Sequence, residues 1–223
     1  MDKVYQLKNK LKQKGIQGIA LDIDETIAAT FRNWVEHLLE DHNEEKLTVE
    51  EMVKKYRYFR DVPYWQKGPA LYKVIEMIGH DKFQEDIPLL EDASLIVNQI
   101  HKIIPVVAYI TARPRKVQGG TVNWLNKYKF PRGELFFRPD DRTDGHRWKG
   151  QVLDILYPQV VGIIDDDPKL VKNMVKDYQG TVFVFNLPEF NTSGYPFKII
   201  PCGKWDHVLE TITSIYGPAK TNN

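Results

Sequence analysis

This sequence of 223 residues has one cysteine, almost no net charge and no long apolar run. The single cysteine, Cys202, excludes an internal disulfide, and no Cys/His spacing matches a zinc site. The formal net charge is +1, so no overall field draws the chain toward nucleic acid or anionic lipid. The longest apolar runs, such as residues 106–110, fall far short of the roughly 20 residues that a membrane helix needs. We therefore expect no membrane partner.

The N-terminal segment and the overall composition predict a cytoplasmic, globular protein. Residues 1–15 are charged and lack the apolar stretch of a signal peptide. Val4, Leu7 and Leu11 form a stripe that favours a helix docked on the domain over a membrane anchor. Hydrophobic residues make up 42% of the chain, which is enough for a core and excludes global disorder.

Strand-like and helix-like segments alternate along most of the chain. Short apolar, β-branched runs predict buried strands at 18–23, 105–111, 135–138, 160–164 and 181–186, and a weaker one at 198–201. Apolar stripes with helical period lie within 90–104, 117–128, 170–178 and 208–215. This alternation predicts an α/β fold, a Rossmann-like parallel sheet sandwiched by helices.

Residues 31–89 interrupt the alternation, because they contain no strand-like run and read as several helices. We predict a helical cap domain at 31–89, inserted after the first strand, and an α/β core domain at 1–30 and 90–223. Such an insertion would lie over the carboxyl ends of the strands, where open α/β sheets bind ligands. Most of its aromatic residues would form a small helical core. Trp34 and Trp65, with Phe31 and Tyr64, are candidates to stack on a planar substrate group.

Two acidic clusters follow predicted strands. Asp22 and Asp24 lie two positions apart at the end of the first strand, so their side chains point to the same face. Residues 165–167 are three aspartates that follow the strand at 160–164. Acidic residues also cap helix N-termini, which explains Asp167 before Pro168 but not both clusters. Carboxylates gathered at one sheet edge repel one another and favour a hard divalent cation such as Mg²⁺.

Two further signals follow predicted strands, and the first of them favours an anion site. The strand at 105–111 leads into Thr111 and Arg113, a hydroxyl and a guanidinium beside a predicted helix N-terminus. We place Lys149 at the start of a helix with apolar positions 152, 153 and 156. An exposed lysine at a helix start is common, so Lys149 gains its weight from the other elements.

Taken in order, these four elements resemble the signature motifs of the haloacid dehalogenase superfamily. The segment Asp22-Ile23-Asp24-Glu25-Thr26 resembles the first motif, Asp-x-Asp-x-Thr. The second, third and fourth motifs are matched by Thr111, by Lys149 and by the pair Asp165 and Asp166. The resemblance covers residues 18–167 and keeps the family's order. Glu25 stands where many members have glycine.

The resemblance implies a phosphatase with an aspartyl-phosphate intermediate. It implies that Asp22 is the nucleophile and Asp24 the general acid and base. It implies Mg²⁺ held by Asp22, by the backbone carbonyl of Asp24, and by Asp165 or Asp166. Phosphate oxygens would be held by Thr111, Arg113 and Lys149. An aspartate at position 24 favours phosphoester hydrolysis over dehalogenation, which does not use that acid.

Two resemblances within the superfamily bear on the substrate. The size and aromatic content of the insertion are similar to those of 5′(3′)-deoxyribonucleotidases. A second resemblance is to the phosphatase half of polynucleotide kinase/phosphatases. It lies in residues 124–125, 137–139, Asp141 with Arg142, and 164–166. No G-x-x-x-x-G-K-[ST] loop for a kinase half occurs. We favour a nucleotide or similar small phosphomonoester over a polynucleotide 3′ end; a protein that only binds a phosphorylated ligand is a third alternative. The sequence predicts no oligomeric state.

Overall fold

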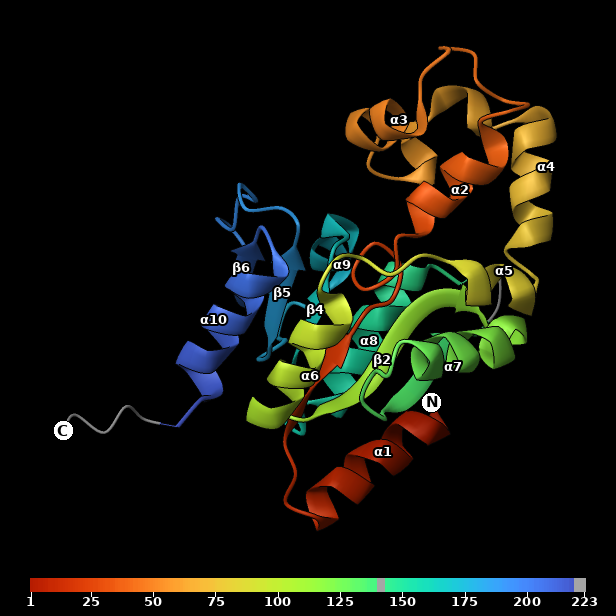
Figure 1. The fold of residues 1–223 in the computed structure, drawn as a ribbon. Helices are drawn as coiled ribbons and strands as arrows, with labels where there is room; N and C mark the ends of the chain where they lie inside the picture. The colour runs from red at the N-terminus through yellow and green to blue at the C-terminus, as the bar shows by residue number, and fades with distance from the viewer. Residues whose placement is uncertain (140–142, 219–223) are drawn as a thin grey trace.

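A computed structural model describes residues 1–139 and 143–218 of the chain (Figure 1). The described residues form a six-stranded sheet in which every pair is parallel, with strand order β3-β2-β1-β4-β5-β6. The strands are β1 (Gly18–Leu21), β2 (Val106–Pro114), β3 (Glu134–Arg138), β4 (Val160–Asp165), β5 (Thr181–Phe185) and β6 (Lys198–Cys202). The six predicted strands and the predicted parallel α/β sandwich are confirmed.

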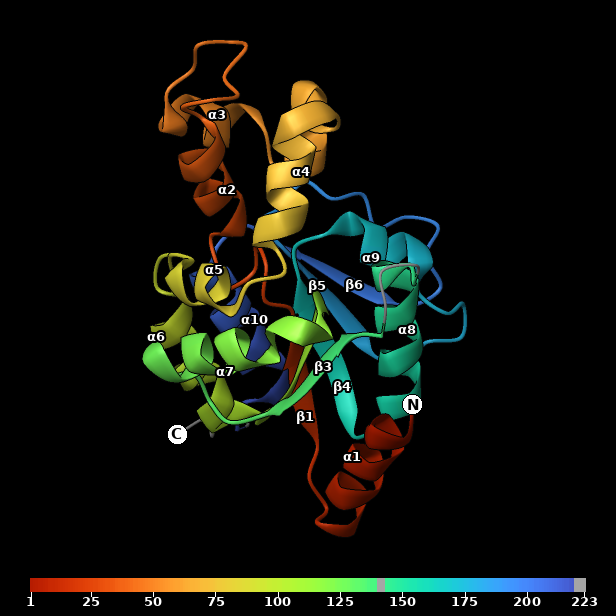
Figure 2. The same cartoon turned by 90° about the vertical axis from the view of Figure 1, so that its right-hand side faces the viewer.

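Helices cover both faces of the sheet (Figure 2). One face carries α6 (Ala93–Ile103), α7 (Gln118–Lys127) and α10 (Trp205–Tyr216). The other carries α1 (Asp2–Gln13), α8 (Gly145–Leu156) and α9 (Pro168–Asn173). The sheet is therefore buried on both sides, which is why β1 is apolar at every position and fully buried. In α1 the stripe Val4, Leu7 and Leu11 is buried against this second face, as predicted.

The segment between β1 and α6 is helical, and we call residues 30–86 the helical insertion. It contains α2 (Thr30–Leu38), α3 (Val49–Lys55), α4 (Gly68–Met77) and α5 (Asp81–Asp86), with short 3₁₀ turns at Phe59–Asp61 and Pro63–Trp65. Helices α2, α3 and α4 stand beyond the carboxyl ends of the strands, whereas α5 lies against α7 (Figures 1 and 2). The contact of α5 with α7 is close: the Gly120 amide donates to Asp81, and a Cβ at Gly120 would collide with the Asp81 backbone.

Apolar side chains of the insertion and of the sheet form one continuous buried cluster. It runs from Trp65 and Met52 in the insertion through Phe31 to Ile19 in β1 and Val97 in α6. The free energy of burying this surface therefore stabilises both parts together.

Two local features differ from the sequence-based expectations. Helix α8 begins at Gly145, because the Asp144 carboxylate accepts from the amides of His146 and Arg147 and caps it there. Lys149 therefore lies in the second turn, and the expectation that it opens the helix is wrong. Helix α9 ends at Asn173, so the stripe predicted over 170–178 is helical only in its first part. In residues 1–139 and 143–218 no helix is long and apolar enough to cross a membrane.

Candidate active site

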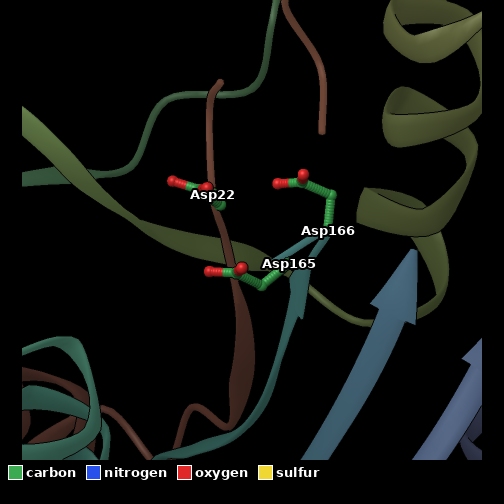
Figure 3. A group of neighbouring side chains, drawn as sticks. All are labelled: Asp22, Asp165 and Asp166. Atoms are coloured by element: carbon green, nitrogen blue, oxygen red, sulfur yellow. The ribbon is translucent and has the colours of Figure 1, made fainter. Parts of the chain in front are cut away.

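The two acidic clusters meet at the carboxyl edge of the sheet because β1 and β4 are neighbours. Leu21 is paired with Ile164, so Asp22 and Asp165 leave adjacent strands at the same level. Figure 3 shows Asp22, Asp165 and Asp166 at the ends of these strands, with their carboxylates pointing to the same side. One carboxylate oxygen from each of the three lies within 4.8 Å of the others, and all three residues are buried.

A buried lysine partly balances this charge. Lys149 Nζ lies 2.7 Å from Asp22 Oδ1 and donates a hydrogen bond to Asp165 Oδ2 at 2.8 Å. Burial alone would lower the pKa of Lys149, but the carboxylates of Asp165 and Asp22 outweigh burial and raise it. The lysine therefore remains a cation between the two strand ends.

One ammonium does not neutralise three carboxylates. Burial raises the pKa of Asp22, and although Lys149 lowers it, the charges of Asp165 and Asp166 add to the rise. Burial likewise raises the pKa of Asp166, with Asp165 and Glu25 adding to it. The site holds more negative charge than its protein partners can stabilise.

Two carboxylate oxygens in the cluster have no hydrogen-bond partner in the described part of the chain. Asp166 Oδ1 accepts from Thr26 Oγ1 at 3.2 Å, but Asp166 Oδ2 is buried and unpartnered. Asp22 Oδ1 instead makes an ion pair with Lys149 Nζ at 2.7 Å. A buried oxygen without a hydrogen-bond donor, in a set of three carboxylates that share one ammonium, fits a hard divalent cation such as Mg²⁺. Asp22, Asp165 and Asp166 are the residues that could hold it.

Asp24 lies at the same edge in a different setting. Its carboxylate accepts from Arg113 Nη2 at 2.8 Å, from Arg113 Nε at 3.1 Å and from Thr30 Oγ1 at 2.6 Å. Burial would raise the pKa of Asp24, but the charge and hydrogen bonds of Arg113 and the Thr30 bond outweigh it and lower the pKa. Asp22 and Asp24, two positions apart, are thus held in opposite electrostatic states, which is typical of paired catalytic carboxylates.

Thr111 and Arg113 extend from β2 beside these aspartates. Thr111 Oγ1 lies 3.5 Å from Asp24 Oδ2 and accepts from the Arg113 amide at 3.2 Å. Arg113 is buried, and its guanidinium is occupied by Asp24 and Thr121. A phosphate would have to compete with Asp24 for Arg113, so its assignment as a phosphate ligand stays a prediction.

Glu25 has a backbone conformation that is rare for a residue with a side chain. Its φ is +57°, in the left-handed region that glycine tolerates best. Its carboxylate accepts from the amide of Phe31 in the first turn of α2, where a negative charge is favourable. Burial raises the pKa of Glu25 to about 8. The hydrogen bond explains how a glutamate is accommodated at this position.

A cavity of about 300 Å³ lies between the strand ends and the insertion. Asp24, Glu25 and Arg113 line it from the sheet side. From the insertion it is lined mainly by apolar side chains: Phe31, Trp34, Phe59, Ile78 and Phe83, with Thr30, Tyr58, Arg60 and Gln84.

The two candidate tryptophans are placed differently. Trp34 lines this cavity and packs on Phe83, with ring centroids 4.2 Å apart. Trp65 has no exposed surface, does not line the cavity, and donates from Nε1 to the His42 carbonyl. We therefore keep Trp34 as the substrate-contact candidate and treat Trp65 as a core residue. Asp141 and Arg142, quoted in the sequence resemblance, lie outside the described residues.

Three residues of the insertion, not predicted from the sequence, contact residues 165–167, which we call the acidic loop. Tyr58 donates to the Asp166 carbonyl at 3.0 Å, and Arg60 pairs with Asp167 at 2.7 Å. Arg57 donates to the carbonyls of Asp166, Phe185 and Asn186. Asp167 itself caps α9, as predicted, by accepting from the Lys169 amide. Nothing in the local sequence of residues 57–60 indicates which part of the sheet they contact.

The fold matches solved structures of haloacid dehalogenase-family hydrolases at low sequence identity. A HAD family hydrolase from Deinococcus radiodurans R1, solved with bound phosphate and sodium, gives a TM-score of 0.52 at 11% identity, over 89% of this chain and 96% of that one. The putative HAD-hydrolase YfnB from Bacillus subtilis, bound to magnesium, gives 0.52 at 14% identity, over 88% and 98%. A dehalogenase gives 0.51 at 11% identity, over 88% and 96%. No family model and no curated protein matches the sequence. The likeness therefore establishes the fold.

Proposed function

We propose that this chain is a phosphomonoester hydrolase of the haloacid dehalogenase superfamily, dependent on Mg²⁺ and acting on a nucleotide or similar small phosphate. One observation carries the proposal. Asp22, Asp165 and Asp166 gather at the carboxyl edge of the sheet with Lys149 beside them, and the buried Asp166 Oδ2 accepts no hydrogen bond from the described residues. A fold shared with HAD-family hydrolases, one of them solved with phosphate and one with magnesium, supports it.

The residues present can divide the chemistry between them. Asp22 attacks phosphorus through a carboxylate oxygen, the bond to the leaving oxygen breaks, and an aspartyl-phosphate forms. Asp24 donates a proton to the leaving alkoxide, then accepts a proton from the water that hydrolyses the aspartyl-phosphate. Lys149 and Thr111 hold phosphoryl oxygens as charge develops.

The resting structure adds one requirement to this scheme. Arg113 keeps the pKa of Asp24 low, so Asp24 begins as a carboxylate. To act as an acid it must be protonated, and a phosphate that draws Arg113 away from Asp24 would raise its pKa. Mg²⁺ bound by Asp22, Asp165 and Asp166 would neutralise the approach of a phosphate dianion to a carboxylate.

The cavity favours a small leaving group with an apolar or aromatic body. Its volume of about 300 Å³ and its aromatic lining suit one nucleoside-sized group. Helices α2–α4 stand over the strand ends and would hinder a duplex from reaching Asp22 (Figure 1). A polynucleotide 3′-phosphatase is therefore our second candidate, and a phospholigand-binding protein the third. A dehalogenase, which shares the fold, would leave Asp24 without a role.

The test is a panel of nucleoside monophosphates, sugar phosphates, 3′-phosphorylated oligonucleotides and 2-haloacids, assayed with Mg²⁺. We expect a mononucleotide or similar phosphate to be preferred, with kcat/KM changing less than about tenfold between roughly 50 and 200 mM salt. A strong preference for the oligonucleotide with steep salt dependence would favour the second candidate.

The nucleophile is tested by Asp22→Asn, which keeps the size of the side chain but cannot attack phosphorus. We expect turnover to fall by about 10³-fold or more while the protein stays folded. Asp177→Asn, at an exposed aspartate, is the matched control and should keep wild-type turnover. A folded Asp22→Asn protein with near-wild-type turnover would refute the covalent mechanism.

A further inference from the structure

Asp166 is held from two sides by parts of the chain that are distant in sequence. From the first-strand side, Thr26 Oγ1 donates to Asp166 Oδ1 and accepts from the Asp166 amide at 3.1 Å. From the insertion side, the Asp166 carbonyl accepts from Tyr58 Oη at 3.0 Å and from Arg57 Nη2 at 3.2 Å. Its amide, its carbonyl and one carboxylate oxygen are thus occupied, and among the described residues no donor makes a hydrogen bond to Asp166 Oδ2.

Arg57 and Tyr58 act as a connected pair. Arg57 Nε donates to Tyr58 Oη at 2.6 Å, and Tyr58 Oη donates in turn to Asp166. Arg57 also donates to the carbonyls of Phe185 at 3.1 Å and Asn186 at 2.7 Å, so it joins the ends of β4 and β5. Burial raises the pKa of Tyr58, so its phenol remains a donor.

We propose that Arg57 and Tyr58 are positioning residues for the candidate cation site, so that docking of the helical insertion and affinity for a divalent cation are coupled. The proposal rests on the cation site of the proposed function. Because coupling free energies are reciprocal, an insertion docked through these bonds favours the cation, and the bound cation favours the docked insertion.

The positive charge of Arg57 would weaken cation binding, whereas its hydrogen bonds would favour it. The variants therefore have to separate the charge from the hydrogen bonds. Arg57 Nη2 lies 4.0 Å from Asp166 Oδ2, so removing its charge would also remove a repulsion that a bound cation feels. Tyr58→Phe deletes the two hydrogen bonds of the phenol, the one donated to the Asp166 carbonyl and the one accepted from Arg57 Nε, without changing charge. Arg57→Lys keeps the charge but cannot reach three carbonyls in a fixed fork.

The neighbouring tyrosine supplies a matched control. Tyr56 Oη donates to Glu45 at 2.8 Å, within the insertion and away from the acidic loop. Tyr56→Phe therefore loses the same kind of phenol hydrogen bond without loosening Asp166. Arg60 is not used, because it lines the cavity as well as pairing with Asp167.

The experiment is calorimetric titration of Mg²⁺ into the full chain, which needs no substrate and no turnover. Losing an outer hydrogen-bond partner of a metal ligand commonly weakens metal affinity by about 10–100-fold. Asp166 keeps one insertion donor in each single variant, so we expect Kd for Mg²⁺ to rise about tenfold in Tyr58→Phe and in Arg57→Lys. The double variant should be weaker still, and Tyr56→Phe should match wild type.

A second measurement reads the coupling from the other side. Hydrogen exchange of residues 56–62 should slow when Mg²⁺ is added to wild type, and this protection should shrink in Tyr58→Phe. If wild type binds Mg²⁺ while both single variants bind within about twofold of it, the coupling is refuted and the cation site stands. If wild type binds no Mg²⁺ at millimolar concentration, the coupling and the cation site both fall.

Discussion

Replacing Asp166 with asparagine tests whether the acidic cluster is built to receive a cation. The side chain keeps its size, and an amide can still interact with Thr26, but one negative charge is removed. In the metal-free wild type the pKa of Asp166 is raised by burial and by its acidic neighbours, so its ionised form destabilises the fold. We therefore expect Asp166→Asn to be more stable than wild type in EDTA.

The pH dependence of this difference follows from the direction of the shift. An acid whose pKa is higher in the folded state contributes no difference below the unfolded value of about 4, where it is neutral in both states. It costs stability increasingly as the pH rises from there toward the folded pKa. The advantage of Asp166→Asn should be small near pH 4 and should grow as the pH rises from there toward the folded pKa of Asp166.

Mg²⁺ should make wild type more stable than Asp166→Asn, the reverse of their order in EDTA. A cation at about 100 times its Kd adds about 2.7 kcal/mol to the stability of the folded state. For a chain of this size that corresponds to a rise in Tm of about 5–11 °C. Without the charged ligand at position 166 the rise should be less than half as large. Thermal unfolding of both proteins, in EDTA and in Mg²⁺ at several pH values, measures all three effects.

Asp167→Asn is the control, because Asp167 is next to Asp166 in the chain but lies in an environment that stabilises its ionised form. Burial would raise the pKa of Asp167, but the Lys169 amide, His146 and Arg60 together lower it. This ionised carboxylate stabilises the fold above its unfolded pKa and loses that contribution as the pH falls, so Asp167→Asn should be less stable than wild type at pH 8. If Asp166→Asn were destabilised in the same way, or gained as much from Mg²⁺ as wild type, our reasoning about the site would be wrong.

Three further predictions follow from single residues. Because Glu25 has φ +57°, Glu25→Gly should be more stable in chemical denaturation than Glu25→Ala by about 1 kcal/mol, and equal stabilities would contradict a backbone cost there. Cys202 has no exposed surface, and burial raises its pKa to about 11. We therefore expect it to resist thiol reagents at pH 8 until the protein is unfolded. Rapid labelling of the native protein would argue against this placement. Trp34→Phe should raise KM more than it lowers kcat, because this side chain lines the cavity. Trp65→Phe should change stability alone, because Trp65 is buried and does not line the cavity. An effect of Trp65→Phe on KM would show that the cavity extends further than described.

The sheet and its acidic edge could be predicted from sequence for a physical reason. Strands buried on both faces are apolar at nearly every position, so their ends are sharply marked, and parallel neighbours bring residues such as Asp22 and Asp165 together. These predictions depend only on period and strand order. The structure places Lys149 beside Asp22 and Asp165, but in the second turn of α8, because Asp144 starts this helix one turn earlier than the sequence pattern predicts.

The insertion could not be predicted at the same level. Whether an aromatic residue in a short helix faces a cavity or a core depends on how the helices pack, which is why Trp34 and Trp65 look alike in sequence and differ in the structure. The contacts of Arg57 and Tyr58 with Asp166 span more than a hundred positions and leave no periodic signal.

The central place of β1 has a consequence for how the chain is made. Thr26 and Asp166 bond across 140 positions, and β1 pairs with β2 on one side and β4 on the other. At about 5–20 residues per second, β4 leaves the ribosome roughly 7–30 s after β1. During that time the edge of β1 that pairs with β4 stays open, and an open edge on an apolar strand is a template for aggregation. The helical insertion follows β1 directly and shares its buried cluster, so we expect it to be the first partner that shields this strand in the growing chain.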